Sequence, residues 1–195
     1  MEIIPLIYIR ERRLLDEKKG KALSLDDLFK QVEKDSMIYV IDLDGTTKDD
    51  PDLDLYQQLS EQYTLWIDNG PRDLDDVMDT IMAGATNITL RKDLWPNADI
   101  AGIREITEDE IYFTIELGQK EQNFDLRFFS EDSGAVIFGD EQQIDESFKS
   151  NPFFKELISK HKLYLYTVPP MHVSYWNEQG VSGILVDVNK KEGYR

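Results

Sequence analysis

Residues 63–95 read YTLWIDNGPRDLDDVMDTIMAGATNITLRKDLW, and this stretch decides the fold that the sequence predicts. Residues 64–67 form a short apolar run rich in aromatic and branched side chains, which is typical of a buried strand. Asn69-Gly70-Pro71 follows as a turn signal. A helix pattern comes next, and residues 86–90 predict a second strand. A strand, a helix and a strand joined by such short turns form a βαβ unit, so we expect the two strands to be parallel.

The helix in the middle of this unit is predicted from its two ends and from its spacing. Asp73 stands where an N-cap residue is preferred, and Asp76 follows three residues later in the capping-box position. Gly84 stands where a glycine commonly ends a helix. The apolar positions between these ends recur at the helical spacing and predict one buried face, made of Leu74, Val77, Met78, Ile81 and Met82.

The same alternation of strand and helix patterns continues along the whole chain. Apolar, β-prone runs predict eight strands, at 3–9, 37–41, 64–67, 86–90, 111–117, 135–138, 163–167 and 182–188. Helix patterns begin near Ser24, Pro51, Asp73, Asn97, Asn151 and Pro169, and the charged segment 10–20 predicts a loop. Eight strands alternating with helices favour an α/β fold, a trimmed (β/α)8 TIM barrel. An open doubly wound sheet has the same local signals and is the alternative.

Two helices of a complete barrel are missing from the pattern. The fifth should lie within 118–133, but apolar and charged side chains alternate over 124–128, which is strand periodicity. We therefore expect an extra hairpin or a loop in its place. Only seven residues follow Val188, so the eighth helix should be absent or reduced to a stub. Strand surface left uncovered would be apolar, and we expect the extra strands or a second copy in a homodimer to cover it.

Length and composition limit the class of protein. At 195 residues the chain suits one barrel domain, 1–195, although such barrels usually take about 250 residues. Hydrophobic residues make up 41%, as in a globular protein. The net charge of −17 argues against nucleic acid and anionic membranes as partners. The chain has no cysteine, which excludes disulfides and thiolate chemistry.

The start of the chain, MEIIP, lacks the charged start and long apolar core of a signal peptide. No apolar run approaches the ~20 residues that span a membrane. We therefore expect a cytoplasmic protein.

Polar residues at the carboxyl ends of the predicted strands form the candidate site, because βα barrels carry their active sites there. The candidates are Tyr8, Asp42, Asp44, Asp68, Arg72, Arg91, Lys92, Glu116 and Asp187. Each has an ordinary alternative role: aspartates cap turns, a tyrosine packs in the core, and Glu116 or the Arg91-Lys92 pair can be solvated. Carboxylates on several strands could bind Mg²⁺, but the spacing predicts no metal site and no cofactor.

Several turns resemble those of the ProFAR isomerase family, the (β/α)8 barrels of histidine biosynthesis. The run IPLIYI at 4–9 is similar to the family's first strand, and DLDG at 42–45 is similar to the turn after its second strand. AGA at 83–85 fits the family's junction between helix and strand. The turns at 68–72 and 90–92 keep the family's frame but few of its phosphate-binding glycines.

The resemblance implies an aldose-to-ketose isomerisation of an aminated sugar phosphate, which needs an acid and a base. It implies that these groups end the first and fifth strands, where this chain has Tyr8 and Glu116. Asp42 is the third catalytic candidate. The resemblance implies a small phosphorylated metabolite as ligand, for which the candidate binding residues are Arg72, Arg91, Lys92, Asp44 and Asp68.

The last two turns depart from the family. Val168-Pro169 replaces a glycine pair, and proline has no N–H to donate to a phosphate. Asp187 places a negative charge where the family has glycine. We therefore expect a divergent member of the family without the standard isomerase activity. The alternatives are a sugar-phosphate isomerase that uses Glu116 and Tyr8, and a non-catalytic binding or assembly protein.

Overall fold

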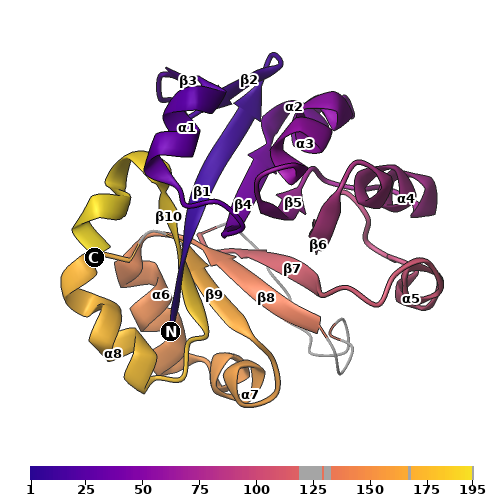
Figure 1. Ribbon diagram of the computed structural model, residues 1–195. Coiled ribbons are helices and arrows are strands. Elements are labelled where there is room, and N and C mark those ends of the chain that lie inside the picture. The colour runs from indigo at the N-terminus through magenta and orange to yellow at the C-terminus, as the bar shows by residue number, and fades with distance from the viewer. Residues whose placement is uncertain (119–128, 130–132, 167, 195) are drawn as a thin grey trace.

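The computed structural model describes residues 1–118, 129, 133–166 and 168–194 and has a closed barrel of parallel strands at its centre (Figure 1). The ring closes because β10 pairs with β1 in parallel. In ring order the strands are β1 (Glu2–Arg10), β4 (Met37–Asp42), β5 (Thr64–Asp68), β6 (Ala85–Leu90), β7 (Ile111–Glu116), β8 (Ser133–Phe138), β9 (Leu163–Tyr166) and β10 (Gly183–Asp187). The predicted (β/α)8 barrel is confirmed, and the open-sheet alternative is wrong.

Helices surround this ring on the outside (Figure 1). They are α1 (Leu25–Gln31), α2 (Leu43–Lys48), α3 (Leu53–Ser60), α4 (Leu74–Met82), α5 (Ile100–Ile106), α6 (Glu141–Ser150), α7 (Pro152–Lys160) and α8 (Val173–Glu178). Side-chain caps explain where several begin: Ser24 and Asp73 accept the backbone N–H groups of Asp27 and Asp76, as the sequence predicts. On α4, Val77 is buried, but Met78 and Met82 are exposed, because this short helix buries a narrower face than its spacing predicts.

Two of the helices, α2 and α6, were not predicted. The segment 42–45, expected to be a turn, begins the short helix α2. The sequence does not predict helix α6, because only two of its ten residues, Ile144 and Phe148, are buried and the apolar spacing is therefore weak. The 3-10 helices η2 (Pro170–His172) and η3 (Val188–Tyr194) complete the fold. Helix η3 follows β10 as the expected stub of an eighth helix. The expected replacement of the fifth helix falls mainly on 119–128 and 130–132, outside the described residues.

The segment expected to be a charged loop instead contains a short antiparallel extension of β1. Strand β2 (Arg13–Leu15) pairs with residues 8–10, beyond the part of β1 that pairs with β10, and β3 (Ala22–Leu23) pairs with β2. The connecting residues Glu11 and Arg12 both have positive φ, 51° and 57°. Tight hairpins need this conformation, but asparagine and glycine usually supply it, so the sequence carries no hairpin signal here.

The interior of the barrel is filled by aromatic rings. Trp66 packs on Tyr112 with ring centroids 3.9 Å apart and meets Tyr164 edge-on at 4.8 Å. Gly134 and Gly183 make room for these rings, since a Cβ there would lie 2.5 Å from Tyr112 and 2.6 Å from Tyr164. The floor of the barrel is therefore closed, and space for a ligand remains above it, at the carboxyl ends of the strands.

Candidate functional site

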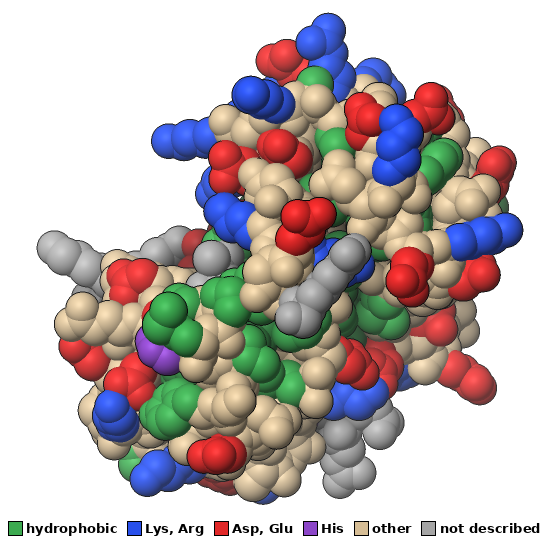
Figure 2. Space-filling model, turned by 60° about the vertical axis from the view of Figure 1, so that its left-hand side comes forward, with side chains coloured by type: hydrophobic (Ala, Val, Ile, Leu, Met, Phe, Trp, Pro, Cys, Tyr) green, Lys and Arg blue, Asp and Glu red, His purple; other side chains and the backbone are tan. Residues whose placement is uncertain are grey.

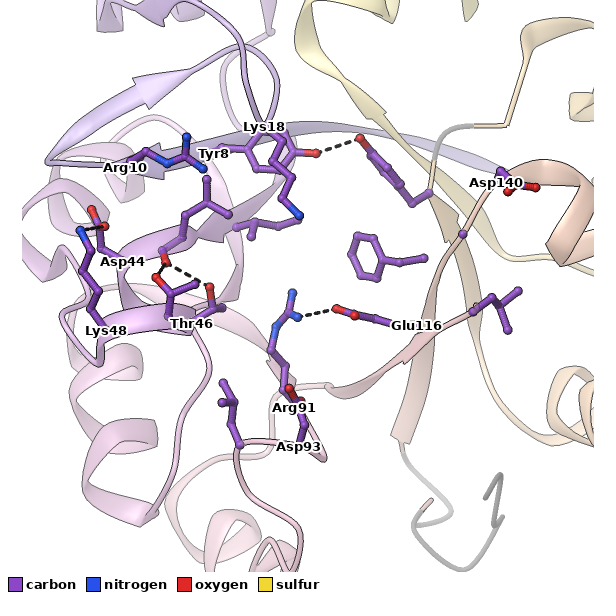
Figure 3. Close-up of a pocket in the computed structure, with 18 of the residues that line it drawn as sticks. Tyr8, Arg10, Lys18, Asp44, Thr46, Lys48, Arg91, Asp93, Glu116 and Asp140 are labelled. Carbon is purple, nitrogen blue, oxygen red and sulfur yellow. Dashed lines mark hydrogen bonds and ion pairs between the residues drawn. The ribbon is translucent and has the colours of Figure 1, made fainter. Parts of the chain in front are cut away.

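A cavity of about 920 Å³ lies in the mouth of the barrel. Side chains from the ends of β1, β6, β7, β8 and β9 line it, together with residues of α2 and of the β2–β3 connection. Figure 3 shows Tyr8, Arg91 and Glu116 around this space. The cavity is where βα barrels carry their active sites, so it is the candidate functional site.

The predicted residue Asp42 lies outside this cavity. On β4 successive side chains alternate, so Tyr39 and Ile41 join the cluster inside the barrel and Asp42 faces the helices. Its fully buried carboxylate accepts backbone N–H groups of Asp44, Gly45 and Asp52 at 2.9–3.0 Å, and the Tyr56 hydroxyl at 2.6 Å. Burial raises the pKa of Asp42, although these donors oppose the shift. The structure assigns it to holding α2 and α3 in place.

The predicted residues Asp68, Arg91 and Glu116 come together in one chain of ion pairs. Arg91 donates from Nε and Nη2 to the two carboxylate oxygens of Asp68, at 2.8 and 2.7 Å. Its Nη1 donates to Glu116 Oε1 at 2.8 Å. Burial alone lowers the pKa of Arg91, but the Asp68 carboxylate raises it above its ordinary range. Arg91 is therefore a fixed cation whose charge is already matched by two carboxylates.

Tyr8 belongs to a second network, on the other side of the mouth. Its hydroxyl lies 3.0 Å from the Tyr166 hydroxyl and 3.2 Å from Asp187 Oδ1, so its single proton can go to either. Asp187 is 1% exposed and also accepts from Lys190 Nζ at 2.8 Å. Burial, Tyr166 and Asp187 raise the pKa of Tyr8 above its ordinary value. The phenol therefore keeps its proton and acts as a hydrogen-bonding group.

Three cations lie along the part of the rim that β1, the β2–β3 connection and α2 form: Arg10, Lys18 and Lys48 (Figure 3). Lys48 pairs with Asp44 at 2.8 Å, and this contact lowers the pKa of Asp44. Asp44 also accepts the backbone N–H of Glu11, which ties the hairpin turn to α2. Within the part of the chain that the structure describes, neither Arg10 nor Lys18 forms an ion pair.

The other predicted phosphate-binding residues are not gathered at this rim. Arg72 donates to Asp49 at 2.6 Å and to the carbonyls of Gly70 and Gly45 at 2.9 and 3.3 Å, so it braces neighbouring turns. Neither Arg72 nor the exposed Lys92 lines the cavity. The sequence analysis did not identify Arg10, which ends β1 at the barrel mouth, or Lys18, which the β2–β3 connection brings to the same rim.

No group of three or more histidine, aspartate or glutamate side chains in the described segments is arranged to hold a metal ion. His161 Nδ1 contacts the Ser133 carbonyl at 2.9 Å, and His172 Nδ1 contacts Glu141 at 2.7 Å. Across 1–118, 129, 133–166 and 168–194, no helix is long and apolar enough to cross a membrane.

Comparisons with known proteins concern the fold. No family model matches the sequence, and no curated protein matches it. The chain is similar to 3-hexulose-6-phosphate synthase from Salmonella typhimurium, with a TM-score of 0.57 over 95% of this chain and 88% of that chain, at 12% identity. It is also similar to HydG, a maturase of FeFe-hydrogenase, with a TM-score of 0.58 at 10% identity; this match covers 94% of this chain and 56% of that one. These likenesses show a TIM-barrel fold, and no sequence match supports the ProFAR isomerase family or the histidine pathway.

Proposed function

We propose that this protein binds a small phosphorylated metabolite of the sugar-phosphate type in the mouth of its barrel. The observation that carries the proposal is the pair Arg10 and Lys18, which line the cavity and form no ion pair among the described residues. A phosphate dianion suits such a pair of cations, because its two negative charges and its several acceptor oxygens match both side chains. The structural likeness to an enzyme named for hexulose 6-phosphate agrees with this ligand class.

The charges of the cavity favour one phosphate over two. The remaining wall carries four carboxylates, Asp93, Glu116, Asp140 and Glu141, which would repel a second anion. Its one cation among the described lining residues, Arg91, is already paired with Asp68 and Glu116. Pro169 also lines it, and a proline donates no backbone N–H to a phosphate. We therefore expect little or no turnover of the doubly phosphorylated ProFAR substrate, and a ligand with a single phosphate group.

A second candidate function is isomerisation of the bound sugar phosphate. It is favoured by Glu116, whose side chain is 36% exposed and lines the cavity at the end of β7. Glu116 would act as the base that moves a proton between neighbouring carbons. Tyr8 would hold a substrate oxygen by a hydrogen bond, because its raised pKa makes it a poor proton source. Arg91 would position Glu116.

Binding is tested by calorimetric titration of the protein with ribose 5-phosphate and with ribose. We expect only the phosphorylated sugar to bind, because hydrogen bonds between charged groups carry the affinity. Lys18→Gln and Arg10→Gln should each weaken binding about tenfold. Matched controls are Lys19→Gln and Arg13→Gln, since these exposed cations are close neighbours that do not line the cavity. Equal binding of ribose, or equal losses in the controls, would overturn the proposal.

Turnover is tested on ribose 5-phosphate and on the ProFAR substrate, each with wild type and Glu116→Gln. Isomerisation of ribose 5-phosphate that disappears in Glu116→Gln supports the second candidate. If ribose 5-phosphate binds but neither compound is turned over, the protein binds sugar phosphates without isomerising them. Complementation of a strain that lacks ProFAR isomerase, or ProFAR turnover abolished by Glu116→Gln, contradicts the expected loss of the standard activity.

A further inference from the structure

The wall of the cavity opposite the cations carries apolar and aromatic side chains between its carboxylates. Strand β8 lies four places from β4 in the ring of eight, and β7 lies four places from β1, so these strands face each other across the mouth. Phe138 ends β8 and Leu117 follows β7, whereas Arg10 ends β1 and Lys48 lies on α2 after β4. Tyr166 and Pro169 continue the apolar wall on the β9 side. The cavity therefore has a cationic pole and an apolar pole.

The apolar pole retains surface for a ligand. Phe138, Leu117, Tyr166 and Pro169 are all half-buried and line the cavity. The Phe138 and Tyr166 rings pack at 40° with centroids 5.4 Å apart, which leaves a bent aromatic surface. Ile41 and Leu43 also line the cavity, but they are more than nine-tenths buried and offer it little area. Figure 2 shows one face of the molecule, on which hydrophobic side chains gather in the lower half and charged side chains are spread over both halves.

Acidic side chains frame the apolar pole and are already engaged by the protein. Glu116 binds Arg91, Asp140 accepts the backbone N–H of Gln143 at 2.9 Å, and Glu141 accepts from Trp176 Nε1 at 3.2 Å. These carboxylates make the apolar pole unfavourable for a second phosphate or a carboxylate. An uncharged end of a ligand avoids this repulsion and gains contact with the rings.

We infer that the ligand is a phosphate monoester whose far end carries an uncharged, flat ring. This inference rests on the proposed function, because Arg10 and Lys18 would hold the phosphate. The ring would lie on Phe138 and Tyr166, where aromatic surfaces attract each other by offset or edge-on packing. A cavity of about 920 Å³ is large for a simple sugar phosphate, and it suits a ligand that carries a phosphate at one end and a ring at the other.

The test is a calorimetric titration with three compounds that all contain a ribose 5-phosphate unit: ribose 5-phosphate itself, adenosine 5′-monophosphate and ribose 1,5-bisphosphate. The nucleotide adds a flat ring to the sugar phosphate, and the bisphosphate adds a second anion. We expect the nucleotide to bind about three- to tenfold more tightly than ribose 5-phosphate. We expect the bisphosphate to bind no more tightly than ribose 5-phosphate, because its second phosphate meets the acidic frame.

Variants at the apolar wall locate the effect. Phe138→Leu should abolish most of the preference for the nucleotide while ribose 5-phosphate binds as before, and Phe138→Tyr, which keeps the ring, should retain the preference. Phe29→Leu is the control, because Phe29 is 41% exposed on α1 and does not line the cavity. Thermal denaturation shows which variants are folded. If Phe138→Leu does not fold, the titrations of the wild-type protein with the three compounds decide the question.

The outcomes separate this inference from the proposed function. If ribose 5-phosphate binds through Lys18 but the nucleotide gains nothing, or the bisphosphate binds most tightly, the inference is wrong and the proposed function stands. If no phosphate ester binds, both are wrong. A nucleotide preference that survives in Phe138→Leu places the ring elsewhere and overturns the inference.

Discussion

Two aspartates at the ends of neighbouring strands, Asp42 on β4 and Asp68 on β5, look alike in the sequence and have different surroundings in the structure. Both are fully buried and both follow apolar runs. Asp42 faces outward and is held by three backbone N–H groups and the Tyr56 hydroxyl. Asp68 faces into the barrel, where Arg91 holds both of its oxygens.

The difference shows that residues at the ends of barrel strands can serve either the stability of the fold or the ligand site. Side chains alternate between the two faces of a strand, so a shift of one residue moves a carboxylate from the ligand side to the helix side. Asp42 organises the chain around it with neutral donors, and Asp68 secures a cation that in turn holds Glu116 at the cavity. Changes at the two positions should therefore affect different properties.

The largest expected effect is that of Asp68→Ala. This substitution leaves the Arg91 guanidinium, 14% exposed, without its main counter-charge. We expect the free energy of unfolding to fall by about 3–5 kcal/mol, as measured by urea denaturation. The exposed pair Lys160–Glu156 is the control, and Glu156→Ala should change stability little. If Asp68→Ala lowered the free energy of unfolding as little as Glu156→Ala does, the buried ion pair of Asp68 would contribute no more to stability than an exposed one.

Asp42→Ala should have the next largest effect, about 2–3 kcal/mol, because it removes a helix cap and leaves the Asp52 N–H and the Tyr56 hydroxyl without their acceptor. At temperatures where the variant is folded, its affinity for ribose 5-phosphate should equal that of the wild type. A folded variant with weakened binding would contradict the assignment of Asp42 to structure and would return it to the site.

The pH dependence of stability sharpens the comparison further. Burial raises the pKa of Asp42 above 3.8, so in the window above that value the folded state binds more protons than the unfolded state. The contribution of Asp42 to stability therefore falls as pH rises through this window. Asp42→Asn does not titrate at this position, so the stability of wild type minus that of Asp42→Asn should fall as pH rises above 3.8. A difference that rises with pH would mean that hydrogen bonds to the carboxylate outweigh its burial.

The smallest expected effect is at Lys190, in the network opposite Asp68. Lys190 Nζ lies 2.8 Å from Asp187 and 3.3 Å from Glu17, the residue before Lys18, and its side chain is 49% exposed. Lys190→Met should weaken binding of ribose 5-phosphate about two- to fivefold, because a partly exposed ion pair positions the loop of Lys18 only weakly. Lys190→Arg should restore most of the affinity. A loss as large as that of Lys18→Gln would mean that Lys190 itself contacts the ligand.

Much of the fold could be predicted from the sequence because it depends on local patterns. Apolar runs and helical spacing over 63–95 are short-range properties, and the structure has the expected βαβ unit there. Prediction failed where the local pattern was weak. Helix α6 buries two side chains, and the hairpin turn at Glu11-Arg12 uses residues that give no turn signal.

The sequence by itself determined an acidic (β/α)8 chain with polar residues at its strand ends. Only the tertiary structure decided which of these residues share a site. It paired Arg91 with Asp68 and Glu116 from the two neighbouring strands, turned Asp42 away, and brought Lys18 to the cavity beside Arg10. The physical reason is that the alternation of side chains along a strand is encoded locally. Strand register decides which face of the barrel a residue lies on, and strands distant in sequence supply the charged side chains that pair with it.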